Sequence, residues 1–113
     1  HLVGDQVLMH VSMVFRKTIR TSDLIGRYGG EEFGIILRRC PAENGMVLAE
    51  KLRSILASTP VKVRGGAEIA VHVSIGVAAY RGDAVQSATD LTADADRALY
   101  AAKAAGRNRV EMA

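Results

Sequence analysis

The sequence predicts an α+β fold in which three amphipathic helices pack on a β-sheet. Three stretches of the chain place apolar residues at steps of three and four, as the buried face of a helix does. Short runs rich in valine and isoleucine lie between these stretches and predict strands. With 113 residues, of which 49% are hydrophobic, the chain has the size and composition of one domain with one core.

The first predicted helix starts at Gly4-Asp5, where Asp5 suits the N-cap or the first turn. Arg16, Lys17 and Arg20 lie near its end, where cations interact favourably with the helix dipole. Its apolar stripe consists of Val7, Leu8, Val11, Val14, Phe15 and Ile19.

Two strands, residues 23–28 and 32–38, are predicted to follow as a β-hairpin. Gly29-Gly30 lies between them, tolerates positive φ and is expected to close a tight turn. Both runs are almost continuously apolar, so we expect this pair of strands at the centre of a sheet that helices cover.

Two glutamates, Glu31 and Glu32, follow these glycines directly. Carboxylates beside a turn with bare backbone suit a site that holds a metal ion close to a ligand. Adjacent strand residues point to opposite faces, so the two side chains are not expected to bind one ion together. From the turn alone, a hairpin that carries two solvated glutamates is an equally good interpretation.

The second helix is expected to begin within residues 40–43, with Pro41 at its first position, and to end at Thr59-Pro60. Its predicted buried face consists of Leu48, Ala49, Leu52, Ile55 and Leu56. A short strand over 61–64, a turn at Gly65-Gly66 and a long strand over 69–80 are expected next.

Thr89 or Asp90 is expected to cap the third helix, and Gly106 suits the position just after its end. The apolar stripe of this helix consists of Leu91, Ala95, Ala98, Leu99 and Ala102, and residues 108–111 predict a closing strand.

Charge and composition narrow the possible ligands. The formal net charge of +3 is modest, and the basic residues are spread along the chain. This distribution favours an anionic small molecule over nucleic acid as the ligand. The aromatic content of 4% is too low for base-stacking platforms. Cys40 is the single cysteine, so an internal disulfide is impossible and a reducing, cytoplasmic setting is expected.

The segment Gly29-Gly30-Glu31-Glu32-Phe33 resembles the signature of the GGDEF family, whose members are diguanylate cyclases, in its GGEEF spelling. The resemblance covers essentially the whole chain, in the order of the family's motifs. It extends over Gly4-Asp5, Arg20-Thr21-Ser22-Asp23, residues 74–78, residues 98–103 and residues 106–110. It implies a ferredoxin-like palm, the fold shared with class III nucleotidyl cyclases.

The resemblance also implies an activity and its partners. Members of the family join two GTP molecules into cyclic di-GMP and release two pyrophosphates, with Mg²⁺ or Mn²⁺ as cofactor. Each of two facing subunits would bind one GTP, so a homodimer across the active site is expected. A sensor or regulatory domain, and any membrane anchor, would lie upstream.

The resemblance assigns the metal and phosphate site to the hairpin turn and the third helix. Glu31 would bind the metal ion near the reacting 3′-hydroxyl, while Gly29, Gly30 and Glu32 would contact the substrate. Lys103 and Arg107 would hold the triphosphate and complete the catalytic set. Basic residues at a helix end also commonly satisfy its last carbonyl groups, which is the structural alternative for this pair.

The resemblance assigns two further recognition roles. Asp5 would accept hydrogen bonds from N1–H and the 2-amino group of guanine. Arg20 and Asp23 match the family's Arg-x-x-Asp product-inhibition site, with five residues between Asp23 and Gly29; the additional cation on the following helix would be Lys51, with Arg53 nearby. A local ion pair between helix and strand is the structural alternative for Arg20 and Asp23.

One stretch of the family pattern has no counterpart in this chain. The family carries Asp-x-Asp-x-Phe-Lys-x-x-Asn-Asp upstream of its Gly-His segment, and this stretch supplies a strand and a second metal carboxylate. We therefore expect residues 1–113 to be a partial domain, truncated at its first strand, inactive alone and prone to self-association. A regulatory module that binds GTP or cyclic di-GMP without turnover, and a dimerisation domain, are the alternatives.

Overall fold

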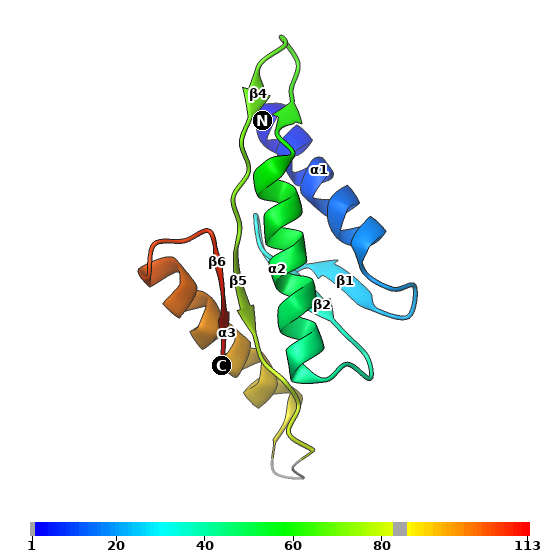
Figure 1. The fold of residues 1–113 in the computed structure, drawn as a ribbon, viewed down its shortest axis with the longest axis vertical. Helices are drawn as coiled ribbons and strands as arrows, with labels where there is room; N and C mark the ends of the chain where they lie inside the picture. Colours follow the sequence, from blue (N-terminus) through cyan, green and yellow to red (C-terminus); the bar gives the residue numbers. More distant parts are fainter. Residues whose placement is uncertain (1, 83–85) are drawn as a thin grey trace.

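The computed structural model describes residues 2–82 and 86–113, and Figure 1 shows their arrangement. No helix of this described part is long and apolar enough to cross a bilayer. The elements in chain order are α1 (Leu2–Thr18), β1 (Leu24–Arg27), β2 (Phe33–Ile36), α2 (Ala42–Ser58), β3 (Val61–Lys62), β4 (Glu68–Ile69), β5 (Ser74–Val77), α3 (Ala88–Ala104) and β6 (Arg109–Met112). This order confirms the predicted α+β class.

The strands pair two by two rather than in one continuous sheet. β1 and β2 are antiparallel, with Leu24 opposite Ile36 and Arg27 opposite Phe33. β3 and β4 are also antiparallel, whereas β5 and β6 are parallel. The expectation that β1 and β2 lie at the covered centre of a sheet is wrong for the described residues. Within residues 2–82 and 86–113 no third strand lies beside the hairpin, and Leu24 and Ile36 are 59% and 61% exposed.

The long strand predicted over residues 69–80 is divided into β4 and β5. β4 pairs with β3 and β5 pairs with β6, while residues 70–73 between them have no ladder partner among the described strands. The chain nevertheless continues alongside α2 from one strand to the next (Figure 1). The segment over residues 69–80 has high β-propensity but forms two short strands, because partner strands are present only at its two ends.

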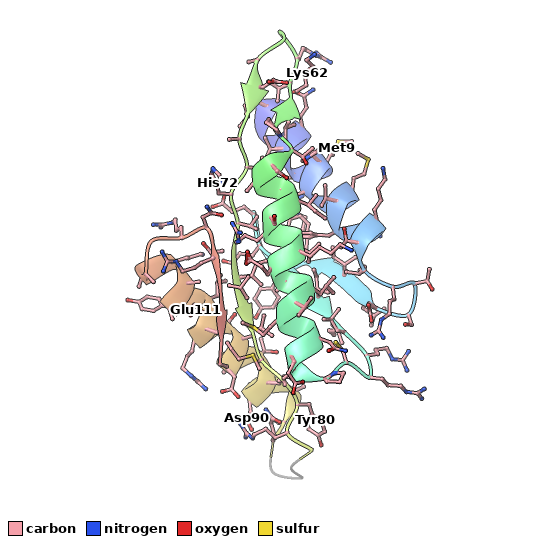
Figure 2. All side chains as sticks on the ribbon, in the orientation of Figure 1. Met9, Lys62, His72, Tyr80, Asp90 and Glu111 are labelled. Atoms are coloured by element: carbon pink, nitrogen blue, oxygen red, sulfur yellow. The ribbon has the colours of Figure 1, made fainter. Side chains whose placement is uncertain are left out.

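The main core lies where α1 and α2 pack against the β3–β4 hairpin, and it confirms the predicted apolar stripes of both helices. Its buried members are Val11, Phe15, Leu52, Leu56, Val61, Val63 and Val71. The ring of Phe33 in β2 meets Phe15 edge to face, with ring centroids 5.5 Å apart, and so attaches the β1–β2 hairpin to α1. Figure 2 shows Met9 on α1 and Lys62 on the β3–β4 hairpin, close to the end of the molecule where this core lies.

A second packed region is formed by α3 against β5 and β6. Ala98 and Ala102 are buried there, and their small side chains let the helix approach the strands closely. The approach is closest at Gly76, where an added Cβ would lie 2.3 Å from the carbonyl oxygen of Ala95 and 2.3 Å from the amide nitrogen of Leu99. Glycine at this position is therefore required by packing.

The helix ends correct two predictions and confirm one. Ser87, not Thr89 or Asp90, caps α3: its Oγ accepts the N–H of Asp90, and the Asp90 carboxylate accepts the N–H of Ser87. Pro41 occupies the N-cap of α2 rather than its first helical position. Gly106 follows the end of α3 as predicted, with φ of 121°.

Candidate functional site

The turn between β1 and β2 carries the signature residues. The N–H of Tyr28 donates to the carbonyl oxygen of Glu32 at 2.8 Å, and the Arg27 guanidinium donates to the carbonyl oxygen of Gly30. Gly29 and Gly30 were expected to tolerate positive φ in a tight turn, but neither residue has a positive φ. An added Cβ would meet nothing within 4 Å at Gly30 and only Glu32 Cβ, 3.8 Å away, at Gly29. The fold of the chain itself therefore does not require either glycine, and the turn leaves its backbone open to an approaching ligand.

Glu31 and Glu32 are both exposed, and within residues 2–82 and 86–113 neither side chain has a hydrogen bond or an ion pair. The described part of the chain also has no group of three or more His, Cys, Asp or Glu side chains that could hold a metal ion. The described residues therefore do not by themselves surround a Mg²⁺ or Mn²⁺ ion. Glu31 offers one free carboxylate, and Mg²⁺ in nucleotide enzymes is usually bound by one or two carboxylates together with substrate phosphates.

Lys103 and Arg107 lie at the C-terminal end of α3, where backbone hydrogen bonds fix the course of the chain. The N–H of Gly106 donates to the Lys103 carbonyl oxygen at 3.3 Å, and that of Arg107 to the Ala102 carbonyl oxygen at 2.9 Å. These two bonds form a Schellman motif. Arg107 and Asn108 follow in the left-handed region, with φ of 62° and 48°. Both cationic side chains are exposed and form no ion pair with the described residues.

Arg53 anchors this loop to α2, a contact that the sequence did not reveal. Its Nη1 donates to Oδ1 of Asn108 at 2.9 Å, and its Nε donates to the Glu50 carboxylate at 2.8 Å and 3.0 Å. The bond to Glu50 also raises the pKa of Arg53. Arg53, on α2, therefore contacts the α3–β6 loop, whereas Lys51 on the same helix is exposed.

Arg20 and Asp23 form a closed ion pair at the start of β1. The Arg20 guanidinium donates from Nε and Nη2 to the two carboxylate oxygens, at 3.1 Å and 2.9 Å. The backbone N–H groups of Arg20 and Arg38 donate to the same carboxylate, at 3.0 Å and 3.2 Å. The Asp23 side chain is only 1% exposed, whereas that of Arg20 is 53% exposed. The geometry thus confirms the local ion pair that was the structural alternative.

The ionisation of this pair follows from its hydrogen bonds. The Arg20 guanidinium is the main cause that lowers the pKa of Asp23 to about 2, and the backbone N–H groups of Arg20 and Arg38 act in the same direction. The hydrogen bond to Asp23 in turn raises the pKa of Arg20. The pair is therefore charged at any physiological pH and connects the end of α1 with the end of β2.

The remaining predicted residues lie apart. Asp5 is exposed in the first turn of α1, where it suits the helix dipole. Within the described part, no hydrogen bond or ion pair joins Asp5, Glu31 and Lys103. The α1–β1 loop, with Arg20, and the α3–β6 loop, with Arg107, lie on opposite sides of the molecule (Figure 1). The structure thus joins Arg20 to Asp23 and places Lys103 and Arg107 at one helix end, on the other side of the molecule.

Comparison with known proteins identifies a single family. The sequence model of the family described as "Diguanylate cyclase, GGDEF domain" matches residues 1–109. Diguanylate cyclase DosC of Escherichia coli K12 is 41% identical over 112 residues, which are 99% of this chain and 24% of DosC. Diguanylate cyclase DgcP of Pseudomonas aeruginosa is 40% identical over 113 residues, which are 100% of this chain and 16% of DgcP. The chain thus spans a quarter or less of the length of these curated relatives.

Solved structures of GGDEF domains have the same fold. A chain of Pseudomonas aeruginosa TpbB (YfiN) that comprises only the GGDEF domain superimposes with a TM-score of 0.92 at 30% identity. The match covers 100% of this chain and 65% of that one. The GGDEF domain of DgcB from Caulobacter crescentus, solved in complex with c-di-GMP, gives a TM-score of 0.90 at 36% identity and is covered to 66%.

Proposed function

Because the chain belongs to the GGDEF family of diguanylate cyclase domains, we propose that it is part of a domain that condenses two GTP into cyclic di-GMP with release of two pyrophosphates. The observation that carries this proposal is the open turn at Gly29-Gly30, which bears the unpaired carboxylate of Glu31. The exposed cations Lys103 and Arg107 at the end of α3 supply the charge that a triphosphate requires.

The exposed residues of the turn and of the end of α3 are each assigned a role in binding GTP. Lys103 and Arg107 bind the triphosphate, and the Schellman backbone keeps Arg107 in position before the substrate arrives. The open backbone of Gly29 and Gly30 lets the phosphates approach, with Glu32 as a further substrate contact. Phosphoryl transfer depends mainly on positioning and charge neutralisation, which is what these groups provide.

Glu31 is proposed as one metal ligand. A divalent cation, Mg²⁺ or Mn²⁺, would neutralise charge on the phosphates when it is bound. The described residues include no group of three or more His, Cys, Asp or Glu side chains that could hold it, so we propose that groups beyond them complete the site. This is also why we propose that the 113-residue chain is inactive when it stands alone.

Recognition of guanine is assigned to Asp5, whose exposed side chain has no hydrogen-bond partner among the described residues. Product inhibition is assigned to the region of Arg20 and Asp23, with Lys51 as an additional cation on the neighbouring helix. The exposed guanidinium of Arg20 can bind an anion although its carboxylate partner is buried.

The architecture proposed for the whole domain is a ferredoxin-like palm that lacks its first strand in this chain. The match to only 65% of a chain that comprises just a GGDEF domain supports this, as does the absence of a third strand beside β1 and β2 among the described residues. Two such domains would face each other as a homodimer, controlled by an upstream sensor domain in a cytoplasmic setting.

A second function, nucleotide binding without turnover, is favoured by one observation. The described residues contain no group of three or more His, Cys, Asp or Glu side chains that could hold a metal ion. A domain that binds GTP or cyclic di-GMP only to regulate a partner would need the cations and Asp5 but no metal site.

The two functions are separated by assaying the intact parent protein with GTP and Mg²⁺ and measuring cyclic di-GMP by chromatography. We expect product from the wild type, and a loss of at least ~100-fold in Glu31→Gln because a charged metal ligand is removed. Glu68→Gln is the matched control, since Glu68 is exposed on β4 and forms no ion pair with the described residues. GTP binding without any product would favour the regulatory module. Wild-type turnover in Glu31→Gln would remove the metal assignment.

A further inference from the structure

The loop between α3 and β6 has a backbone conformation that needs support from outside the loop. Three consecutive residues, Gly106, Arg107 and Asn108, have positive φ, with values of 121°, 62° and 48°. Glycine adopts this region readily and asparagine tolerates it, but it is unfavourable for arginine. The backbone bonds to the last turn of α3 come from Gly106 and Arg107 and restrain the loop on one side of Arg107 only.

Arg53 on α2 supplies a restraint on the other side of Arg107. Its Nη1 donates to Oδ1 of Asn108 at 2.9 Å, a contact between residues 55 positions apart in the chain. The guanidinium is itself fixed by Glu50, which accepts the Nε hydrogen at 2.8 Å and 3.0 Å and a further bond from Nη2. One edge of the planar guanidinium is thus held by a carboxylate on the same helix, and Nη1 on the other side reaches the loop in a defined geometry.

The chain after Asn108 is also fixed, whereas the side chain of Arg107 is left free. The carbonyl oxygen of Arg107 accepts the Nε hydrogen of Arg109 at 3.2 Å. Arg109 is the first residue of β6, a strand that contacts both α3 and α2. The backbone of Arg107 is therefore held from both directions, while its exposed guanidinium forms no ion pair with the described residues.

Arg53 itself is poorly suited to bind a phosphate. Its side chain is 21% exposed, and Nε, Nη1 and Nη2 each donate to Glu50 or to Asn108. Its charge is compensated by Glu50 in an ion pair. Lys103 and Arg107, in contrast, are exposed and have no ion pair among the described residues. The surroundings of Arg53 thus suit a residue that orients its neighbour.

We propose that Arg53 is a positioning residue for GTP binding: through Asn108 it keeps the backbone of Arg107 in the conformation that presents the Arg107 guanidinium to the triphosphate. The inference rests on the proposed function, in which Arg107 binds the triphosphate, and adds to it a residue on a different helix. Without the bond from Arg53 the loop can leave its left-handed conformation, and part of the free energy of binding then goes into restoring it. GTP binding should weaken, but only as long as Arg107 is present.

The test is a double-mutant cycle on the intact parent protein, measured by calorimetry with a non-hydrolysable GTP analogue and Mg²⁺. Arg53→Ala is expected to weaken binding about tenfold, the scale of one charge-assisted hydrogen bond. Arg107→Ala alone should weaken binding by at least about tenfold, because a direct contact with the triphosphate is lost. In the Arg107→Ala background, Arg53→Ala should change the affinity by less than about twofold.

Two further variants separate geometry from charge. Arg53→Lys keeps the positive charge but lacks the planar fork that contacts Glu50 and Asn108 together, so it should bind within about threefold of Arg53→Ala. Arg97→Ala is the matched control. Arg97 also forms an i,i+3 ion pair on a helix, but its side-chain hydrogen bond goes to Asp94 and not to the α3–β6 loop. This variant should bind the analogue like the wild type.

The proposal is overturned if Arg53→Ala binds like the wild type, or if it weakens binding equally with and without Arg107, as a general loss of fold would. It is also overturned if Arg53→Lys has wild-type affinity, since Arg53 would then act through its charge.

Failure of the inference differs from failure of the proposed function. A strong effect of Arg107→Ala together with none of Arg53→Ala refutes this inference alone. Unchanged binding in Arg107→Ala refutes the phosphate role of Arg107, and the inference with it. Analogue binding that depends on both arginines, in a parent protein without cyclase activity, supports the inference and refutes only the proposed catalysis.

Discussion

Replacement of Gly76 by alanine tests how α3 is held against β5. The new Cβ would lie 2.3 Å from the Ala95 carbonyl oxygen and from the Leu99 amide nitrogen, and 2.9 Å from the Leu99 Cα. All three are backbone atoms of one helix, so no side chain can rotate away to relieve the overlap. The helix as a whole would have to retreat by about 1 Å to restore an ordinary contact of 3.4 Å.

The cost of this retreat can be bounded. Overpacking of a well-packed core typically costs ~1–3 kcal/mol, and a clash with rigid helix backbone belongs at the upper end. The retreat would also loosen the contacts of Ala98 and Ala102, which are 4% and 0% exposed. We therefore expect Gly76→Ala to lower the free energy of unfolding by about 3 kcal/mol, a large part of the ~5–15 kcal/mol typical of a domain.

The assay is urea denaturation of the intact domain followed by far-UV circular dichroism, with Gly45→Ala as the matched control. Gly45 lies inside α2, where an added Cβ would lie 3.8 Å from a Leu37 methyl and 3.9 Å from a Val77 methyl. Alanine there should stabilise the helix by ~0.5–1 kcal/mol. Replacement of glycine by alanine is thus expected to raise the free energy of unfolding at position 45 and to lower it at position 76. A Gly76→Ala domain that unfolds at the wild-type urea midpoint would refute the close packing of α3 on β5.

Three further predictions concern charge, recognition and association. The pKa of Asp23, about 2 when folded, lies below the ~3.9 of an unfolded aspartate, so its stabilisation is present above pH ~4 and lost as the pH falls towards 2. Asp23→Asn should therefore be less stable than the wild type at pH 6, and urea titrations should show this difference shrinking towards pH 2; a difference independent of pH would contradict the assignment. Asp5→Ala in the parent protein should weaken GTP binding by ~1–3 kcal/mol because guanine donors lose their acceptor, and unchanged calorimetric affinity would leave Asp5 with only its helix role. The 113-residue chain alone should form oligomers in gel filtration and make no cyclic di-GMP, since β1 and β2 expose Leu24 and Ile36; an active monomer of 12.1 kDa would contradict both statements.

Local patterns in the sequence predicted the helices and most of the hairpin. The stripes that contain Val11, Leu52 and Ala98 are buried as expected, because a periodicity of 3.6 residues already specifies which face of a helix must leave water. Gly106 was predictable for a similar reason, since the conformation just after a helix end depends on neighbouring residues alone. The family motifs likewise lie within short segments and could be recognised without coordinates.

The pairing of strands and the surroundings of each charged group depended on contacts between distant segments. The run over residues 69–80 has strand propensity throughout, but its ladder forms only where β3 and β6 supply partners. Arg53 meets Asn108 across 55 positions of the chain, and Arg38 reaches Asp23 across 15. No local pattern records such distances. The set of four donors around Asp23 and the need for glycine at position 76 therefore follow only once the helices and hairpins have packed, because each depends on which atoms of other segments lie nearby.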